Sequence, residues 1–461
     1  MALSLDGNSQ ESINRIAVVL ACGMLVVVGG GACWDWKTRG LKATKSTPPA
    51  WALALLAYSY ALLIPAIFVT LFSMKIGAVD VIVLEEASDS TLQFIQLLGE
   101  TGSWLGAVMV AIFAIVVPLL KLGLLILGEC WRCSKDKSRV LAARGCIRFV
   151  QQISKWACPD LIAYIFLFYL VHHLNHYPIN GLFRLELGFT CYTLFCWGST
   201  ISSLGIHLPR MPESAETKTP KEPWVLRNLG KRGTATTVFV VQIVFLVFFV
   251  LGLSWSCLGL RLKPDLLAEH GLPEWQIQIM EELDVEKNAY ADVTIFTCVE
   301  MLMKAQQESF DANAIFAVVM LVLFVVGLTL LDMAVLAVAA VQTLCSSDHH
   351  VVEDNRCNFI TLAKYLKKMA MLDVLILGVL VVVLSGSVYQ EQGLVLLPGW
   401  GLLALFIAEL MHYLTYFIVR SLAQAIPANV AQKEMSDSTT TESTDIGSDD
   451  NDSVEEKGLS I

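Results

Sequence analysis

Four ionisable residues lie inside stretches that are otherwise as apolar as membrane spans: Lys121, Asp332, Glu409 and His412. Ionisable groups inside a membrane are costly, and they usually face a partner or a water-filled cavity. All four are therefore candidates for groups that take part in transport.

Lys121 and Asp332 end two matching patterns, Phe-xxxx-Pro-Leu-Leu-Lys and Phe-xxxx-Thr-Leu-Leu-Asp, which lie 211 residues apart. Opposite charges at equivalent depth predict a buried ion pair between the two residues. The alternative for Lys121 is that its long side chain extends to the membrane surface, about 10 Å away at 1.5 Å per residue. The side chain of Asp332 is too short for that, so it needs a partner or water.

Glu409 and His412 are three residues apart, which puts both side chains on one face of a helix. A proton relay is one interpretation of this pair. A hydrogen-bonded structural pair is the other, and the position of both residues in the predicted cytosolic half of their span favours it.

A short motif, KWACPD, begins with Lys155 and Trp156 and ends with Asp160, and a weaker copy runs from Lys368 to Asp373. Each aspartate opens a predicted span, where a carboxylate in the first turn favours the helix N-terminus. The alternative is that the aspartates contact a lipid headgroup or a coupling ion at the inner membrane surface. Trp156 is typical of an interfacial anchor.

Three cysteines and two prolines complete the candidate residues. Cys130, Cys133 and Cys146 are weak candidates for a zinc site, because a structural site needs four ligands and no fourth is evident. We therefore expect no metal and no cofactor. Pro65 and Pro118 lie within predicted spans and predict helix kinks.

The composition indicates an integral membrane protein of the all-α class. Of the 461 residues, 55% are hydrophobic and 16% are charged, which is more apolar surface than a soluble core can bury. Most of the net charge of −10 comes from the last 29 residues, where nine acidic residues face two lysines. The membrane body is close to neutral, which excludes a basic nucleic-acid surface, and no catalytic motif occurs, so we do not expect an enzyme.

The spans that must position these residues are about 20 apolar residues long. Nine stretches qualify: 15–33, 51–73, 104–128, 158–175, 187–206, 236–259, 312–341, 371–389 and 400–419. Lysine and arginine concentrate in the loops after spans one, three, five and seven, which predicts a cytosolic C-terminus and an N-terminus outside. The first span resembles a signal peptide, but its cleavage would reverse every later span against this charge pattern, so we expect it to be retained.

Spans two to five and six to nine follow the same plan, which predicts two parallel four-helix repeats after an N-terminal helix. The predicted regions are 1–50 (first span and basic loop), 51–207 (first repeat), 208–235 (basic cytosolic linker), 236–421 (second repeat, with an outer segment at 260–311) and 422–461 (disordered acidic cytosolic tail).

Over roughly residues 51–421 the chain resembles the paraquat-inducible protein A family of multi-pass membrane proteins. The resemblance rests on KWACPD and its weaker copy, on the upstream VVPLLKL, on the helix starts at Gly188 and Gly399, and on the two four-span units. Bacterial family members are partners of mammalian-cell-entry (MCE) domain proteins, which form lipid conduits. Those relatives carry paired CxxC zinc ribbons before each unit, whereas the one CxxC here, Cys130-Trp-Arg-Cys133, follows the third span.

The resemblance implies lipid or amphipath transport, with membrane lipids and an MCE-type protein as partners. The intramembrane charges leave open a secondary transporter or channel, and the repeat plan leaves open a non-transporting scaffold. Serine and threonine among the tail acids suggest a kinase as a further partner, or a tail that is only solvated.

Overall fold

The fold is a computed structural model that describes residues 7–39, 47–78, 82–173, 179–209, 224–262, 291–308, 310–345, 352–386 and 394–441. Helices dominate it, as predicted. The stretch PEWQIQIMEELDVEKNAY of the outer segment, for which the sequence predicts a helix, lies outside the described residues. Helix α1 (Gly7–Arg39) precedes the two repeats. Hydrogen bonds near both of its ends hold it against the repeats. Near the N-terminal end, the Asn14 amide donates to the Phe310 carbonyl. Near the C-terminal end, the Asp35 carboxylate accepts from the backbone N–H groups of Ala50 and Trp51 at 3.0 and 3.1 Å.

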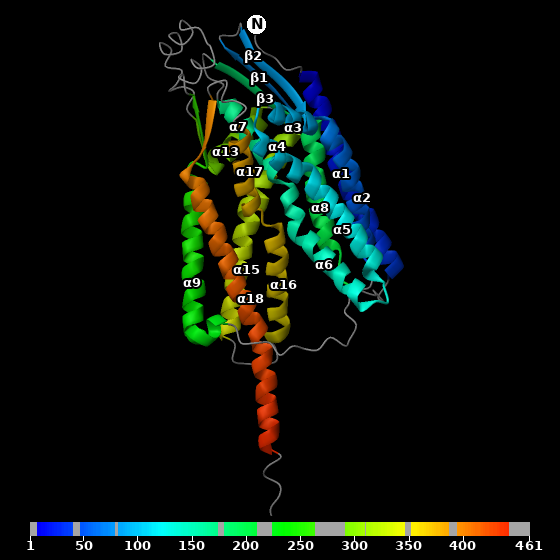
Figure 1. The fold of residues 1–461 in the computed structure, drawn as a ribbon, viewed down its shortest axis with the longest axis vertical. Helices are drawn as coiled ribbons and strands as arrows, with labels where there is room; N and C mark the ends of the chain where they lie inside the picture. Colours follow the sequence, from blue (N-terminus) through cyan, green and yellow to red (C-terminus); the bar gives the residue numbers. More distant parts are fainter. Residues whose placement is uncertain are drawn as a thin grey trace, which may run out of the picture.

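The first repeat combines helices with one small sheet. Its elements in chain order are α2 (Ala50–Phe68), β1 (Thr70–Ala78), β2 (Ile82–Ser90), α3 (Thr91–Glu100), α4 (Trp104–Ala111), the π-helical segment η1 (Ile112–Val116), α5 (Val117–Arg132), α6 (Lys137–Ile153), the 3₁₀ turn η2 (Ser154–Ala157), α7 (Pro159–His173), β3 (Ile179–Leu185) and α8 (Leu187–Gly205). Strand β1 pairs antiparallel with both β2 and β3, and this sheet lies at one end of the helices (Figure 1).

The second repeat has the same plan. Its described elements are α9 (Trp224–Ser254), β4 (Leu258–Leu262), β5 (Ala291–Val293), α13 (Ile295–Glu308), α14 (Ala312–Val318), the π-helical segment η3 (Val319–Gly327), α15 (Leu328–Cys345), α16 (Val352–Met369), α17 (Leu372–Ser385), β6 (Leu394–Pro398) and α18 (Trp400–Thr441). Strand β4 is central and pairs antiparallel with β5 and β6, as β1 does in the first repeat. Helix α9 bends at Gly230, whose φ of 65° favours glycine.

The repeats meet through α7 and α17, which pack against each other. Nearly every side chain of α7 is buried, so this helix is apolar all round rather than amphipathic. Within each repeat the first and last helices pack together, α2 on α8 and α9 on α18.

Eight helices in the described ranges are long and apolar enough to cross a membrane, which confirms a polytopic membrane protein. The expected span 187–206 forms the 19-residue helix α8, which is not among the eight. Its six serine and threonine side chains are all buried: Thr190, Thr193, Ser199, Thr200, Ser202 and Ser203.

Two regional predictions are corrected. The segment after the third span is not a loop, because residues 137–153 form α6, which buries Val140, Ala143, Ile147 and Val150 on one face. The tail is not irregular from residue 422, because α18 continues to Thr441 and extends past the end of the bundle opposite the β1–β3 sheet (Figure 1).

Candidate functional site

Each repeat contains one interrupted helix, and the candidate site lies where these interruptions meet. Helices α6 and α7 belong to one apolar stretch, Lys137–His173, and are separated by η2. Helices α16 and α17 belong to a second apolar stretch, Phe359–Ser385, in which the helix is interrupted between Met369 and Leu372. Interrupted helices leave backbone groups unpaired inside a membrane protein, so they occur where protein or a cavity satisfies them.

The KWACPD motif occupies the first interruption rather than the entrance to a span. Lys121, near the middle of the apolar stretch Trp104–Arg132, donates a hydrogen bond to Ser154, the first residue of η2. The motif therefore lies at mid-height of the neighbouring helix, inside the apolar stretch Lys137–His173, and its place at the inner membrane surface stays a prediction. The prediction took α6 for a loop because its basic residues obscured the helical period.

An ion pair joins the two repeats at this level. Lys155 Nζ lies 2.8 Å from Asp373 Oδ1, and both side chains are largely buried. Lys155 also donates to the carbonyl of Ala370, the residue that follows the C-terminal end of α16, at 2.9 Å. A cation suits the C-terminus of a helix and a carboxylate suits an N-terminus, so this one pair stabilises the end of α16 and the start of α17.

Asp373 has further partners. Its carboxylate accepts from its own first turn, the Val374 N–H at 3.0 Å, and from the Trp156 indole and the Tyr413 hydroxyl, each at 3.4 Å. Trp156 keeps 39% of its surface exposed. The expected first-turn position of Asp373 is therefore observed, together with a contact to the other repeat.

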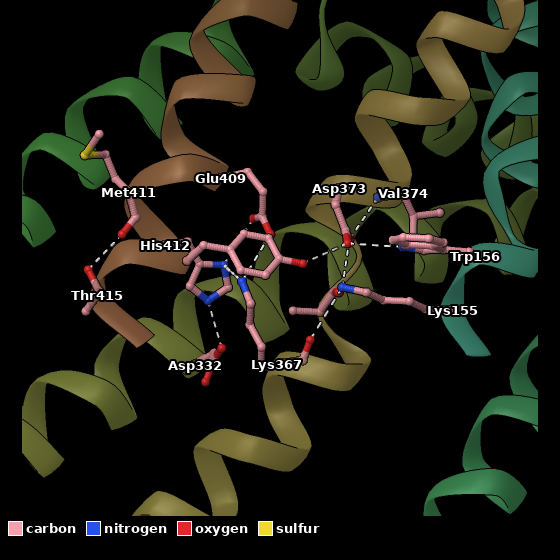
Figure 2. Close-up of polar contacts among 12 residues, drawn as sticks. Lys155, Trp156, Asp332, Lys367, Asp373, Val374, Glu409, Met411, His412 and Thr415 are labelled. Carbon is pink, nitrogen blue, oxygen red and sulfur yellow. Dashed lines mark hydrogen bonds and ion pairs between the residues drawn. The ribbon is translucent and has the colours of Figure 1, made fainter. Parts of the chain in front are cut away.

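A second polar cluster lies in the second repeat, between α15, α16 and α18. His412 Nε2 is 2.8 Å from Asp332 Oδ2, and His412 Nδ1 is 3.1 Å from Glu409 Oε2 and 2.9 Å from Lys367 Nζ (Figure 2). Lys367 also pairs with Glu409 at 3.1 Å. All four residues are buried.

The distances around His412 fit two sets of hydrogen bonds, one for the neutral imidazole and one for the protonated ring. The neutral ring accepts from Lys367 at Nδ1 and donates to Asp332 from Nε2. The protonated ring donates from both nitrogens, to Glu409 and to Asp332, and gives the four residues a net charge of zero. The two clusters are linked, because the Lys367 ammonium lies 3.5 Å from the centroid of the Tyr413 ring, whose hydroxyl contacts Asp373.

The predicted pairing of Lys121 with Asp332 is wrong. Asp332 pairs with His412, and Lys121 contacts Ser154 within its own repeat. Lys121 is also fully buried, so its side chain does not extend to the surface either. Each of the two residues therefore has its partner within its own repeat, and equivalence in the repeat pattern does not bring them together.

The first repeat has hydroxyls where the second has charges. Ser154 Oγ lies 2.9 Å from Ser203 Oγ, and it contacts Thr200 at 3.4 Å. The cluster of the second repeat uses Lys367, which sequence reasoning missed; it occupies the position equivalent to Ser154 at the 213-residue spacing of the two motifs. Applying the 213-residue spacing of the two motifs to Ser154 would have pointed to Lys367 from the sequence.

The remaining candidates lie apart from these clusters. Pro118 is the second residue of α5, which begins where η1 ends, and Pro65 lies in the last turn of α2. Cys130 and Cys133 are exposed and Cys146 is half-buried, and no group of three metal-ligating side chains occurs within the described ranges. Asp160 is fully buried at the start of α7.

Residues 50–206 match the family model described as paraquat-inducible protein A. The match covers the first repeat and confirms the resemblance over that range. No curated protein and no solved structure matches the chain. Residues 236–421 lie outside the matched paraquat-inducible protein A segment, yet they repeat its element order, including the π-helical segment and the interrupted helix.

Proposed function

We propose that this membrane protein moves a lipid or another anionic amphipath through the interface between its two repeats. The observation that supports the proposal is the position of Lys155, Asp373 and the half-exposed Trp156 at the paired helix interruptions. Interrupted helices at a repeat interface are a common location for transported ligands. The family match to the first repeat agrees with this reading.

Basic side chains near this interface indicate the charge of the transported molecule. Lys364 of α16 interacts electrostatically with Arg144 and Arg148 of α6 and with Arg420 of α18, and Lys368 interacts with Lys364 and Arg148. Like charges gathered in one place repel one another, and an anionic group relieves that repulsion. Arginine also binds phosphate with two parallel hydrogen bonds. A phospholipid headgroup with net negative charge fits this set.

The test is lipid transfer by the full chain in proteoliposomes, with a fluorescent anionic phospholipid and its zwitterionic counterpart. Arg148 and Lys364 are exposed, so Arg148→Glu with Lys364→Glu should fold. We expect this double variant to slow movement of the anionic lipid at least tenfold and to affect the zwitterionic lipid little. Lys304→Glu, at an exposed residue of α13, is the control. Movement no faster than in protein-free liposomes would overturn the proposal.

The second candidate function is proton-coupled transport of a small solute, supported by the cluster of Asp332, Lys367, Glu409 and His412. Exchange between the two sets of hydrogen bonds at His412 would take up and release one proton. Proton flux into proteoliposomes, measured with a pH-sensitive dye, should be lost in His412→Gln. Unchanged flux would leave the cluster with a structural function.

Four further expectations belong to this proposal. The protein acts without enzymatic chemistry, and its C-terminus is cytosolic with the N-terminus outside. An MCE-domain protein is its conduit partner, and a kinase modifies the tail. Purification in mild detergent followed by mass spectrometry of lipids, proteins and phosphopeptides tests the partners. If the co-purified lipids have the composition of the whole membrane and no conduit protein is found, the result would count against these partners.

A further inference from the structure

A small cavity lies between the repeats, beside the site described above. Helices α3, α4 and α7 of the first repeat form one side, and α17, Gly386 and β6 of the second form the other. Its walls are mostly aliphatic, and it has room for about two water molecules.

Three polar side-chain atoms in this cavity have no hydrogen-bond partner: Asp160 Oδ1, Tyr164 Oη and Ser385 Oγ. The residues are only 1%, 2% and 7% exposed, respectively. A buried polar group without a partner costs about 1–3 kcal/mol. Three of them around one cavity indicate an occupant that binds oxygen atoms.

The charges around the cavity are negative. The described contact of the Asp160 side chain is a 3.5 Å hydrogen bond from Tyr192, and no lysine or arginine in the described ranges forms an ion pair with it. Tyr164 interacts electrostatically with both Asp160 and Asp89. The N-terminus of α7 stabilises the Asp160 carboxylate from one side, so a cation is needed on the other.

We propose that Asp160, Tyr164 and Ser385 bind a monovalent metal cation, Na⁺ or K⁺, together with water. A single carboxylate balances one positive charge, so a divalent ion would leave charge uncompensated. The ion takes one of the two water-sized places, so three protein oxygens and about one water supply its hard oxygen ligands. The aliphatic walls give no room for a large organic cation. This site is separate from the proposed lipid transfer, because ion binding is measured on purified protein with no transfer step.

The experiment measures the melting temperature of the purified full chain in detergent, in NaCl, in KCl and in N-methyl-D-glucamine chloride at equal ionic strength. A ligand that binds only the folded state raises the melting temperature with its concentration. We expect a rise with Na⁺ or K⁺ over the large organic cation, and the ion with the larger rise is the ligand. Direct titration with that ion should give one saturable site.

The variants locate the site. Asp160→Asn should abolish the ion-dependent rise, and Tyr164→Phe and Ser385→Ala, which keep the carboxylate, should each weaken ion binding about tenfold. These two variants retain the test if Asp160→Asn does not fold. Glu300→Gln, at an exposed residue, should keep the full response. Equal melting temperatures in all three salts would overturn the proposal. An unchanged ion response in Asp160→Asn, Tyr164→Phe and Ser385→Ala would overturn it too. The cavity would then hold water beside a protonated Asp160 instead of a metal ion.

Discussion

The two helix interruptions, η2 in the first repeat and residues 370–371 in the second, share a backbone plan and differ in charge. Asp373 opens α17 with Lys155, Trp156 and Tyr413 around its carboxylate. Its equivalent Asp160 opens α7 fully buried, with one carboxylate oxygen unpartnered. The equivalent position therefore carries a carboxylate with several partners in the second repeat. In the first repeat it carries a buried carboxylate that lines a cavity and has one unpartnered oxygen atom.

The clusters beside the interruptions differ in the same way. Lys121 contacts hydroxyls in the first repeat, whereas Asp332 joins a network of four ionisable groups in the second. Both interruptions occur although their side chains differ, so the shared backbone plan does not require one particular set of charges. The network of ionisable side chains lies in the second repeat, whereas hydroxyl groups occupy the equivalent place in the first.

The largest effect that tests this comparison is expected for Lys155→Ala. The substitution leaves Asp373 without its counter-charge and the end of α16 without its donor, so the free energy of unfolding should fall by about 3–5 kcal/mol. Equilibrium unfolding in detergent measures it. The matched control is Lys368→Ala, since Lys368 donates to the neutral Gln151 and should lose only about 1 kcal/mol. Equal losses of unfolding free energy in the two variants would mean that the Lys155–Asp373 ion pair stabilises the fold no more than the Lys368–Gln151 hydrogen bond does.

The next largest difference is expected between the two aspartates. Asp373→Asn weakens a charge-assisted pair and should lower the free energy of unfolding by about 2–3 kcal/mol. Asp160→Asn removes no cationic partner and should change it by less than about 1 kcal/mol when measured without Na⁺ or K⁺. A larger loss at Asp160 than at Asp373 would reverse the comparison.

The sequence predicted eight of its nine spans, the repeat and the burial of Asp332, Glu409 and His412, because apolar length and intramembrane charge are local signals. It failed at α6, where basic residues suggested a loop although Val140, Ala143, Ile147 and Val150 keep a helical period. It could not predict the partners of Lys121 and Asp332, because equivalence between repeats is not proximity. The contact of Lys155 with Asp373 depends on how the repeats dock, which no local pattern encodes.

The alignment of the repeats at their last helices also needed the structure. The backbone N–H of Glu186 bonds to the Leu71 carbonyl, and that of Gly399 bonds to the Cys257 carbonyl. Gly399 is thus equivalent to Glu186, and Gly188 is equivalent to Gly401 rather than to Gly399. The corrected spacing of 213 residues is that of Asp160 and Asp373.

The shared backbone plan predicts similar losses at this glycine pair. A Cβ atom at Gly401 would lie 2.4 Å from the Trp255 carbonyl oxygen, and one at Gly188 would lie 2.6 Å from that of Thr70. Gly401→Ala and Gly188→Ala should each lower the free energy of unfolding by about 1–3 kcal/mol, because backbone must move. The control is Gly123→Ala in α5, where nothing lies within 4 Å and a helical alanine should not destabilise. A loss at one glycine alone would show that the last helices dock differently.

The smallest effect is expected in the hydroxyl cluster of the first repeat. Ser203→Ala removes one neutral hydrogen bond to Ser154, and Lys121 keeps its own bond to Ser154, so the free energy of unfolding should fall by roughly 1 kcal/mol. Ser421→Ala, at an exposed hydroxyl bonded to the preceding turn of α18, should have no measurable effect. A loss at Ser203 as large as that at Lys155 would mean that Lys121 depends on the whole hydroxyl cluster. The first repeat would then hold a buried charge as tightly as the second, and the division between a hydroxyl-based and a charge-based interruption would fail.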